Sequence, residues 1–124
     1  MRVCVSLGLL YAIYLVTTQA ISLWHFRRGS PEEIEKAIEW DPGNARFYAA
    51  RAQALRMSVE GADVNEVIRL NQIATRLSPY QAWYWAELAG SYEWAGREEQ
   101  AQRAYERAGQ LFPNSPEINW KLGN

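Results

Sequence analysis

The chain begins with its longest apolar stretch. Val3–Leu23 contains no charged side chain, and a membrane-spanning helix needs about 20 predominantly apolar residues. An aromatic segment, Trp24–Phe26, follows and precedes Arg27 and Arg28, which is the order typical of a helix that ends at a membrane surface. The pattern predicts a transmembrane anchor helix over residues 3–26, with the bilayer as the partner of Val3–Phe26.

After Gly29 the apolar residues recur at helical spacing in shorter segments. In the first of them Ile34, Ala37 and Ile38 share one face, and Ser30 with Glu33 has the sequence of a capping box. The expected helices are Pro31–Trp40, Ala45–Met57, Val64–Leu77, Pro79–Ala95, Arg97–Phe112 and a last one that Ser115 and Pro116 begin. The chain is therefore expected to be all-α, with a helical domain over residues 30–124.

One stretch of that domain, Ala82–Pro113, has a specific order of large and small residues. It reads Trp85-x2-Leu88-Ala89-x2-Tyr92, then Gly96, then Ala101-x3-Tyr105-x2-Ala108 before Pro113. This spacing resembles the tetratricopeptide repeat, a helix–turn–helix unit of about 34 residues. The resemblance implies a solenoid of helical hairpins in which Ala89 and Ala101 let two helices approach and Gly96 reverses the chain.

The flanking segments resemble the repeat less well. A partial unit at 31–44 has the second helix of a repeat without its first, and an irregular repeat at 45–79 precedes the regular repeat at 80–113. Pro42 and Pro79 are three residues further apart than Pro79 and Pro113, so a longer turn is expected around Ser58–Ala62. A partial helix at 115–124 follows, and its Ile118 and Trp120 make it a poor polar cap for a repeat array.

The N-terminal segment also allows another interpretation. Thr17, Thr18 and Gln19 weaken the apolar run, and Met1–Ala20 could be a cleaved secretory signal. The uncharged run continues beyond Ala20, which favours an uncleaved single-pass anchor. Basic residues are nearly balanced on its two sides, and a short tail with an arginine usually stays inside, so the domain is expected on the extracytoplasmic or periplasmic side.

Composition limits the chemistry that is expected. The net charge is −1, and residues 29–124 hold all 14 acidic residues, so the domain is a poor nucleic-acid binder. Cys4 is the single cysteine and His25 the single histidine, which leaves no zinc site and no nucleophile–base pair. A histidine such as His25 can ligate a haem or chlorophyll metal but is more often an interfacial polar residue, so no cofactor and no enzyme activity are expected.

The resemblance also implies where partners bind. In tetratricopeptide proteins the first helices of successive repeats line a concave groove that holds segments of other proteins. The matching positions predict these partner-binding residues: Arg46, Gln53, Arg56, Trp83, Glu93, Trp94 and Trp120. The rings would act as anchors and the arginines would pair with acidic or C-terminal groups, although Trp83 and Trp94 could instead be core residues. The set of residues with which some members grip a C-terminal carboxylate is not reproduced, because Ala49 and Gln53 occupy two of its places.

These patterns predict a membrane-anchored scaffold that docks other proteins, membrane proteins among them, near the bilayer. The alternative is an accessory or structural subunit of a larger membrane complex, of a photosynthetic or respiratory kind. A free scaffold should purify alone as a monomer, whereas an obligate subunit should migrate with a large assembly.

Overall fold

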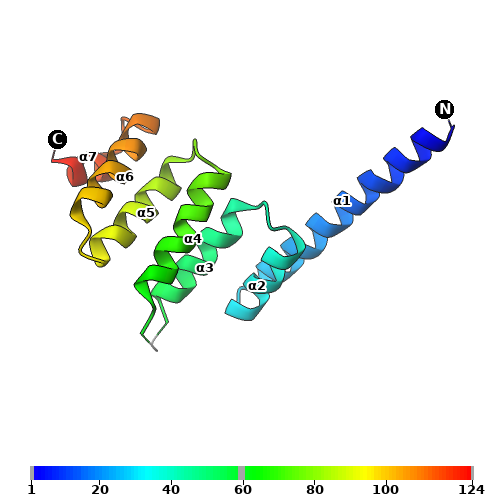
Figure 1. The fold of residues 1–124 in the computed structure, drawn as a ribbon, viewed down its shortest axis with the longest axis horizontal. Helices are drawn as coiled ribbons and strands as arrows, with labels where there is room; N and C mark the ends of the chain where they lie inside the picture. The colour runs from blue at the N-terminus through cyan, green and yellow to red at the C-terminus, as the bar shows by residue number, and fades with distance from the viewer. Residues whose placement is uncertain (1, 59–60, 124) are drawn as a thin grey trace. The chain divides into compact units, whose positions relative to one another are not determined.

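The computed structural model describes residues 2–58 and 61–123, and every regular element within these ranges is an α-helix (Figure 1). The helices are α1 (Arg2–Arg28), α2 (Pro31–Trp40), α3 (Ala45–Arg56), α4 (Val64–Leu77), α5 (Ala82–Trp94), α6 (Glu98–Leu111) and α7 (Pro116–Leu122). The prediction of an all-α chain with one long apolar N-terminal helix is confirmed. The helices form two compact units, Met1–Gly43 and Asn44–Asn124, and each is described by itself.

The first unit is a hairpin of α1 and α2, which pack against each other. Gly29 reverses the chain with a φ of 73°, a value that favours glycine. The Ser30 hydroxyl accepts a hydrogen bond from the Glu33 N–H at 3.3 Å and so caps α2. In a capping box the Glu33 carboxylate would accept a hydrogen bond from the Ser30 N–H. This prediction is wrong, because the carboxylate pairs with His25 and Lys36 instead. The sequence predicted the second helix of a repeat without its first at 31–44, and the structure packs α1 against α2.

In the second unit each helix packs against the next one along the chain, from α3 to α7. This is the arrangement of a solenoid, in which each repeat contacts only the repeats next to it. The predicted bounds of Val64–Leu77 agree with α4, and α3 and α6 agree within one residue at each end. The longer turn before α4 is confirmed, because α3 ends at Arg56 while α4 begins only at Val64; Val59 and Glu60, in the middle of that turn, lie outside the described residues.

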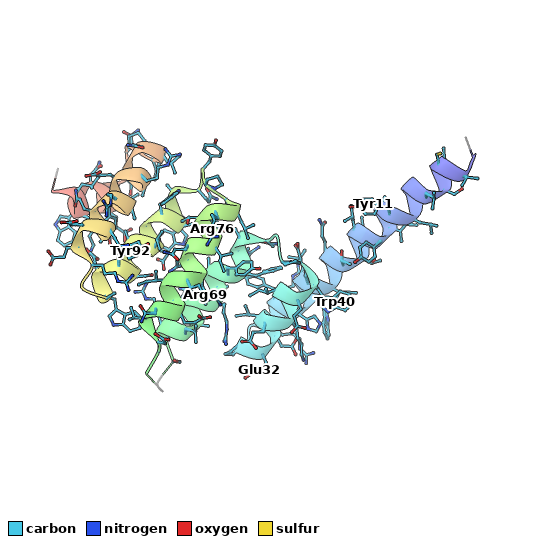
Figure 2. All side chains as sticks on the ribbon, in the orientation of Figure 1. Tyr11, Glu32, Trp40, Arg69, Arg76 and Tyr92 are labelled. Atoms are coloured by element: carbon cyan, nitrogen blue, oxygen red, sulfur yellow. The ribbon has the colours of Figure 1, made fainter. Side chains whose placement is uncertain are left out.

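The main core lies between α4, α5 and α6. Ala89, Ala101 and Ala104 are almost fully buried there, and Tyr92 and Tyr105 fill the space around them (Figure 2 labels Tyr92). The small side chains let the helix backbones approach, and the rings cover the apolar area that remains. The order of large and small residues thus acts as the packing code that the sequence predicted.

Polar side chains also hold α4 to α5. The Asn71 amide donates to the Ser91 hydroxyl at 2.7 Å, and both side chains are buried. Gln72 donates to the Tyr92 hydroxyl at 2.9 Å. Asn71 stands eight residues before Pro79, as Tyr105 stands before Pro113, so the irregular repeat has a hydrogen-bonded amide where the regular one has a ring.

The expected start of the helix at Pro79 differs from the structure. The helix predicted from Pro79 begins at Ala82, because Ser78 still belongs to the end of α4, where its N–H donates to the Ala74 carbonyl. Asp63 caps α4 by accepting a hydrogen bond from the Asn65 N–H at 2.9 Å, and Glu66 pairs with Arg69 on the same helix.

Gly96 ends α5 in a Schellman motif. Its N–H donates to the Glu93 carbonyl, and the Arg97 N–H donates to the Tyr92 carbonyl, both at 2.9 Å. The φ of Gly96 is 73°, and a Cβ added there would meet no atom within 4 Å. A substitution would therefore be costly because of the backbone conformation alone.

We expect Gly96→Ala to destabilise the domain by about 1 kcal/mol, because an L-side chain disfavours the left-handed conformation. That loss corresponds to a decrease in Tm of about 4–8 °C, measurable by circular dichroism. Gly90→Ala is the matched control: Gly90 is helical and has only the Tyr105 hydroxyl at 4.0 Å from a built Cβ, so alanine should be neutral or stabilising there. Equal Tm values for Gly96→Ala and the wild type would contradict the strain assigned to this turn.

Candidate functional site

A groove of about 730 Å³ lies along one face of α5. Its floor is formed by Trp83, Ala86, Glu87, Gly90 and Glu93, which follow one another at helical spacing. Ala86 and Gly90 are small, so the middle of the floor has room for a backbone or side chain of another molecule. Arg56 of α3 lines one part of the groove, and Glu117, Ile118 and Lys121 of α7 line another.

Aromatic rings that keep much of their surface exposed line this groove. Tyr80 is 79% exposed, Trp83 58% and Phe112 55%. Tyr80 and Phe112 are supplied by the turns that precede α5 and follow α6. Exposed aromatic rings around a concave surface are typical of sites that bury an apolar part of a partner.

An ion pair links α3 to the groove floor. Arg56 donates through Nη1 to Glu87 Oε2 at 3.2 Å. The Glu87 carbonyl also accepts from the Asn71 amide of α4 at 3.5 Å, so this segment of α5 is held by both α3 and α4. The Arg56 guanidinium therefore already has a carboxylate partner within the chain.

A second cluster joins α5, α6 and α7. Lys121 Nζ lies 3.0 Å from Glu93 Oε2, and the Tyr105 hydroxyl donates to the same oxygen at 3.0 Å. Burial, and then the hydrogen bond to Glu93, raise the pKa of Tyr105 well above its ordinary value. Lys121 also lies 5.6 Å from the centroid of the Trp120 ring, a cation–π distance.

The predicted partner-binding residues separate into two sets. Arg56, Trp83 and Glu93 come together in the groove. The remaining four, Arg46, Gln53, Trp94 and Trp120, are exposed on α3, α5 and α7 but do not line it. Trp83 and Trp94, 58% and 50% exposed, are not buried in the core.

Tyr80, Tyr105 and Phe112 also line the groove and were not predicted from the sequence. None of them lies on the first helix of a repeat, which is where the family pattern directs attention. Tyr80 and Phe112 each adjoin a repeat-closing proline, Pro79 or Pro113. An aromatic residue beside such a proline is the signal that could have indicated them.

His25 lies at the contact between α1 and α2. Its Nδ1 pairs with Glu33 Oε2, and Lys36 Nζ lies 3.3 Å from Glu33 Oε1. The hydrogen bond from His25, followed by that from Lys36, lowers the pKa of the Glu33 carboxyl below its ordinary value of 4.5. The one histidine is thus part of the hairpin contact.

Within the described residues, Val3–Arg28 is the one helical segment long and apolar enough to cross a membrane, with a mean hydropathy of 1.7. A membrane span and a signal sequence near the N-terminus share these properties. Cys4 lies on this helix and is exposed.

Comparison with known proteins agrees with this architecture. Residues 82–124 match the family model of the tetratricopeptide repeat, which confirms the repeat recognised at Ala82–Pro113. No curated protein sequence matches the chain. A fold of this kind typically serves as a scaffold for protein–protein interactions and is not typically an enzyme.

Several solved structures have a similar fold. The crystal structure of MamA has a TM-score of 0.69 at 22% identity, over 86% of this chain and 63% of its own, so this chain spans less than two thirds of MamA. The first TPR of Spaghetti (RPAP3), bound to the HSP90 peptide SRMEEVD, has a TM-score of 0.68 at 20% identity, over 87% of this chain and 86% of its own. The N-terminal domain of stress-induced protein-1 from C. elegans has a TM-score of 0.66 at 18% identity, over 87% of this chain and 91% of its own.

We expect the Glu33 carboxylate to stabilise the α1–α2 hairpin in a pH-dependent way. Its pKa is lower in the folded chain, so its contribution is fully present above the unfolded value near 4.5 and is lost as the pH falls through the folded value. Glu33→Gln should lower Tm at pH 7, and the difference from the wild type should shrink toward pH 3. Glu39→Gln, at an exposed position of the same helix, is the control; a difference for Glu33→Gln that stays constant with pH would contradict the pairing.

Proposed function

We propose that this chain is a membrane-anchored protein-interaction module. Helix α1 holds the repeat domain at the bilayer, and the groove along α5 binds a segment of a partner protein there. The observation that carries the proposal is the groove of about 730 Å³ with Tyr80, Trp83 and Phe112 exposed in it.

The groove suits an apolar side chain of a partner. Aromatic rings are frequent hot spots of protein interfaces because each buries a large area at a low cost in conformational entropy. Trp83 lies next to the part of the floor formed by Ala86 and Gly90, where the side chains of α5 are small. An extended segment could therefore lie along α5 with an apolar residue against Trp83.

The charges of the groove favour a partner segment that also carries lysine or arginine. Glu87, Glu93 and Glu117 outnumber Arg56 and Lys121. Both basic groups already pair with a carboxylate of the chain. A lysine or arginine of the partner could therefore interact with Glu117 and with the net negative charge of the groove. The peptide bound to the Spaghetti domain is instead rich in acidic residues, and we expect this groove to select a different segment.

Exposed apolar residues outside the groove favour a second candidate, an accessory subunit of a larger membrane complex. Met57 is 77% exposed and Trp120 75%, and neither lines the groove. A permanent neighbour would cover them. Arg46, Gln53, Trp94 and Trp120 stay predicted contacts for such a wider surface, and the extracytoplasmic side of the domain stays a prediction as well.

Site-specific photocrosslinking in native membranes can test the interaction proposal. A benzophenone amino acid at position 83 should capture a defined partner, identifiable by mass spectrometry after gentle solubilisation. The control is position 103, because Arg103 is exposed on α6 and does not line the groove. The same products from both positions, or none from position 83, would argue against a groove-bound partner. If all of the chain migrates with one large assembly in a native gel, the result would support the second candidate, an accessory subunit of a membrane complex.

We expect Trp83→Ala to weaken binding of the captured partner by about 30-fold or more, the loss of about 2 kcal/mol that defines an interface hot spot. Stability should change by less than about 0.5 kcal/mol, because the ring is 58% exposed. Trp94→Ala is the matched variant, with a similarly exposed tryptophan on the same helix outside the groove. Binding by isothermal calorimetry and Tm by circular dichroism separate the effects. Equal losses for both variants would mean that the contact is not centred on the groove.

A further inference from the structure

Helix α1 changes character along its length. The large apolar residues from Val3 to Val16 are exposed, for example Leu10 at 63% and Ile13 at 51%, and Figure 2 shows Tyr11 projecting from this part of the helix. From Thr18 onward a stripe of partly or fully buried residues begins. Its members are Thr18, Ile21, Ser22, His25 and Phe26, which is the i, i+3, i+4, i+7, i+8 spacing of a helix face packed against protein.

This stripe has the register of the first helix of a repeat. Ser22 lies seven residues before Gly29, as Ala89 lies seven before Gly96. Ser22 and Ala89 are both 0% exposed, and both glycines have a φ of 73°. The end of α1 thus has the small buried residue and the turn glycine of the regular repeat at the same spacing.

The extent of the fold similarity agrees with this register. The match to MamA covers 86% of the chain, and 86% of 124 residues is about 107. Residues 29–124 contain fewer than that, so the tetratricopeptide fold of the matched structure extends into α1.

Charges on α2 limit how deep the end of α1 can lie in a membrane. Helix α2 turns back along α1 after Gly29, and its 10 residues extend for about 15 Å, a distance that reaches back to about Thr18. Glu32, Lys36 and Glu39 are exposed on α2, and Figure 2 shows Glu32 on this helix. Charged side chains facing lipid at the depth of the hydrocarbon are costly, so water must reach the level of Thr18.

We propose that the lipid–water boundary crosses α1 between Thr17 and Thr18, and that Thr18–Arg28 is the first helix of a further repeat outside the hydrocarbon. The inference rests on the proposed anchoring of α1 in a bilayer. It places Ala20 and Leu23, at the end of the uncharged run, in water. One unbroken helix is then both the membrane anchor and part of the repeat domain.

The aromatic and basic residues at the end of α1 have partners within the same helix. The Arg28 guanidinium lies 4.8 Å from the centroid of the Trp24 ring, and the Trp24 and His25 rings meet edge to face at 4.9 Å. The order of aromatic and then basic residues, which predicts a membrane surface at Trp24–Arg28, is thus also explained by contacts between neighbouring side chains of α1.

Cysteine labelling of the full chain can locate the boundary. In a Cys4→Ser background, single cysteines replace Leu10, Ile13, Ala20, Leu23 and, as the water-exposed control, Asn114; all five positions are exposed in the structure. Open membrane fragments are treated with a membrane-impermeant maleimide. We expect Ala20→Cys and Leu23→Cys to react as fast as Asn114→Cys, and Leu10→Cys and Ile13→Cys to react at least about tenfold more slowly, because lipid excludes the reagent.

Two other results would overturn the inference and differ in what they mean. Protection of positions 20 and 23 to the same degree as 10 and 13 would move the boundary to Trp24 or beyond while leaving the anchor intact. Equal, fast labelling at all five positions would refute membrane anchoring itself, and the boundary with it.

A pair of leucine substitutions tests the repeat register independently. Ser22→Leu puts a large side chain at a fully buried site, whereas Ala20→Leu puts it on the exposed face. Both make α1 more apolar, so a purely lipid-facing helix would tolerate both. We expect Ser22→Leu to speed hydrogen exchange of the α2 amides by about tenfold, because overpacking opens the hairpin, and Ala20→Leu to leave it unchanged. Equal exchange in the two variants would overturn the register.

Discussion

Close approach of paired helices at one small residue is the constraint on which this structure depends. Ser22, Ala52 and Ala89 occupy that position in the three hairpins and are at most 2% exposed. A larger side chain there would separate the helices and open voids among their neighbours. Because the position is fixed by packing, it also fixes the rotation of each helix, and that rotation determines which of its residues face outward.

The groove is a product of this rotation. On α5, Leu88, Ala89 and Tyr92 face the core, so Trp83, Glu87 and Glu93 must lie on other faces of the helix. The Arg56–Glu87 and Lys121–Glu93 pairs then tie α3 and α7 to α5. Surface ion pairs of this kind contribute little to stability, and their main effect here is to hold the groove walls in place.

The sequence predicted the hairpins well where packing demands a periodic pattern. The bounds of α2 and α4 follow from their cap residues and apolar stripes. The turn at Gly96 follows from a local backbone conformation with positive φ, which favours glycine. The partnership of α1 with α2 could not be predicted in the same way. A lipid-facing surface and a protein core both accept apolar residues, so an uncharged run such as Val3–Leu23 does not show where a lipid-facing segment would end and a protein-packed one begin.

The groove was only partly predictable for a different reason. Its key pairs join residues far apart in sequence, such as Arg56 with Glu87 and Glu93 with Lys121, and no local pattern specifies such pairs. The burial of Asn71 was equally hidden, because its partner Ser91 lies on another helix. The family pattern supplied Trp83 and Glu93 through their places on α5, but it gave no information about rings in the turns.

One wall of the groove rests on α7, a helix of 7 residues. So short a helix has little intrinsic stability, and its order depends on the packing of Ile118 and Leu122 against Gly109. The contact is close, because a Cβ added at Gly109 would lie 3.1 Å from Leu122. Local unfolding of α7 would break the Lys121–Glu93 ion pair and remove this side of the groove. If the groove binds a partner as proposed, its occupancy is thermodynamically linked to the ordering of α7, and a change that loosens the contact at Gly109 would also weaken that binding.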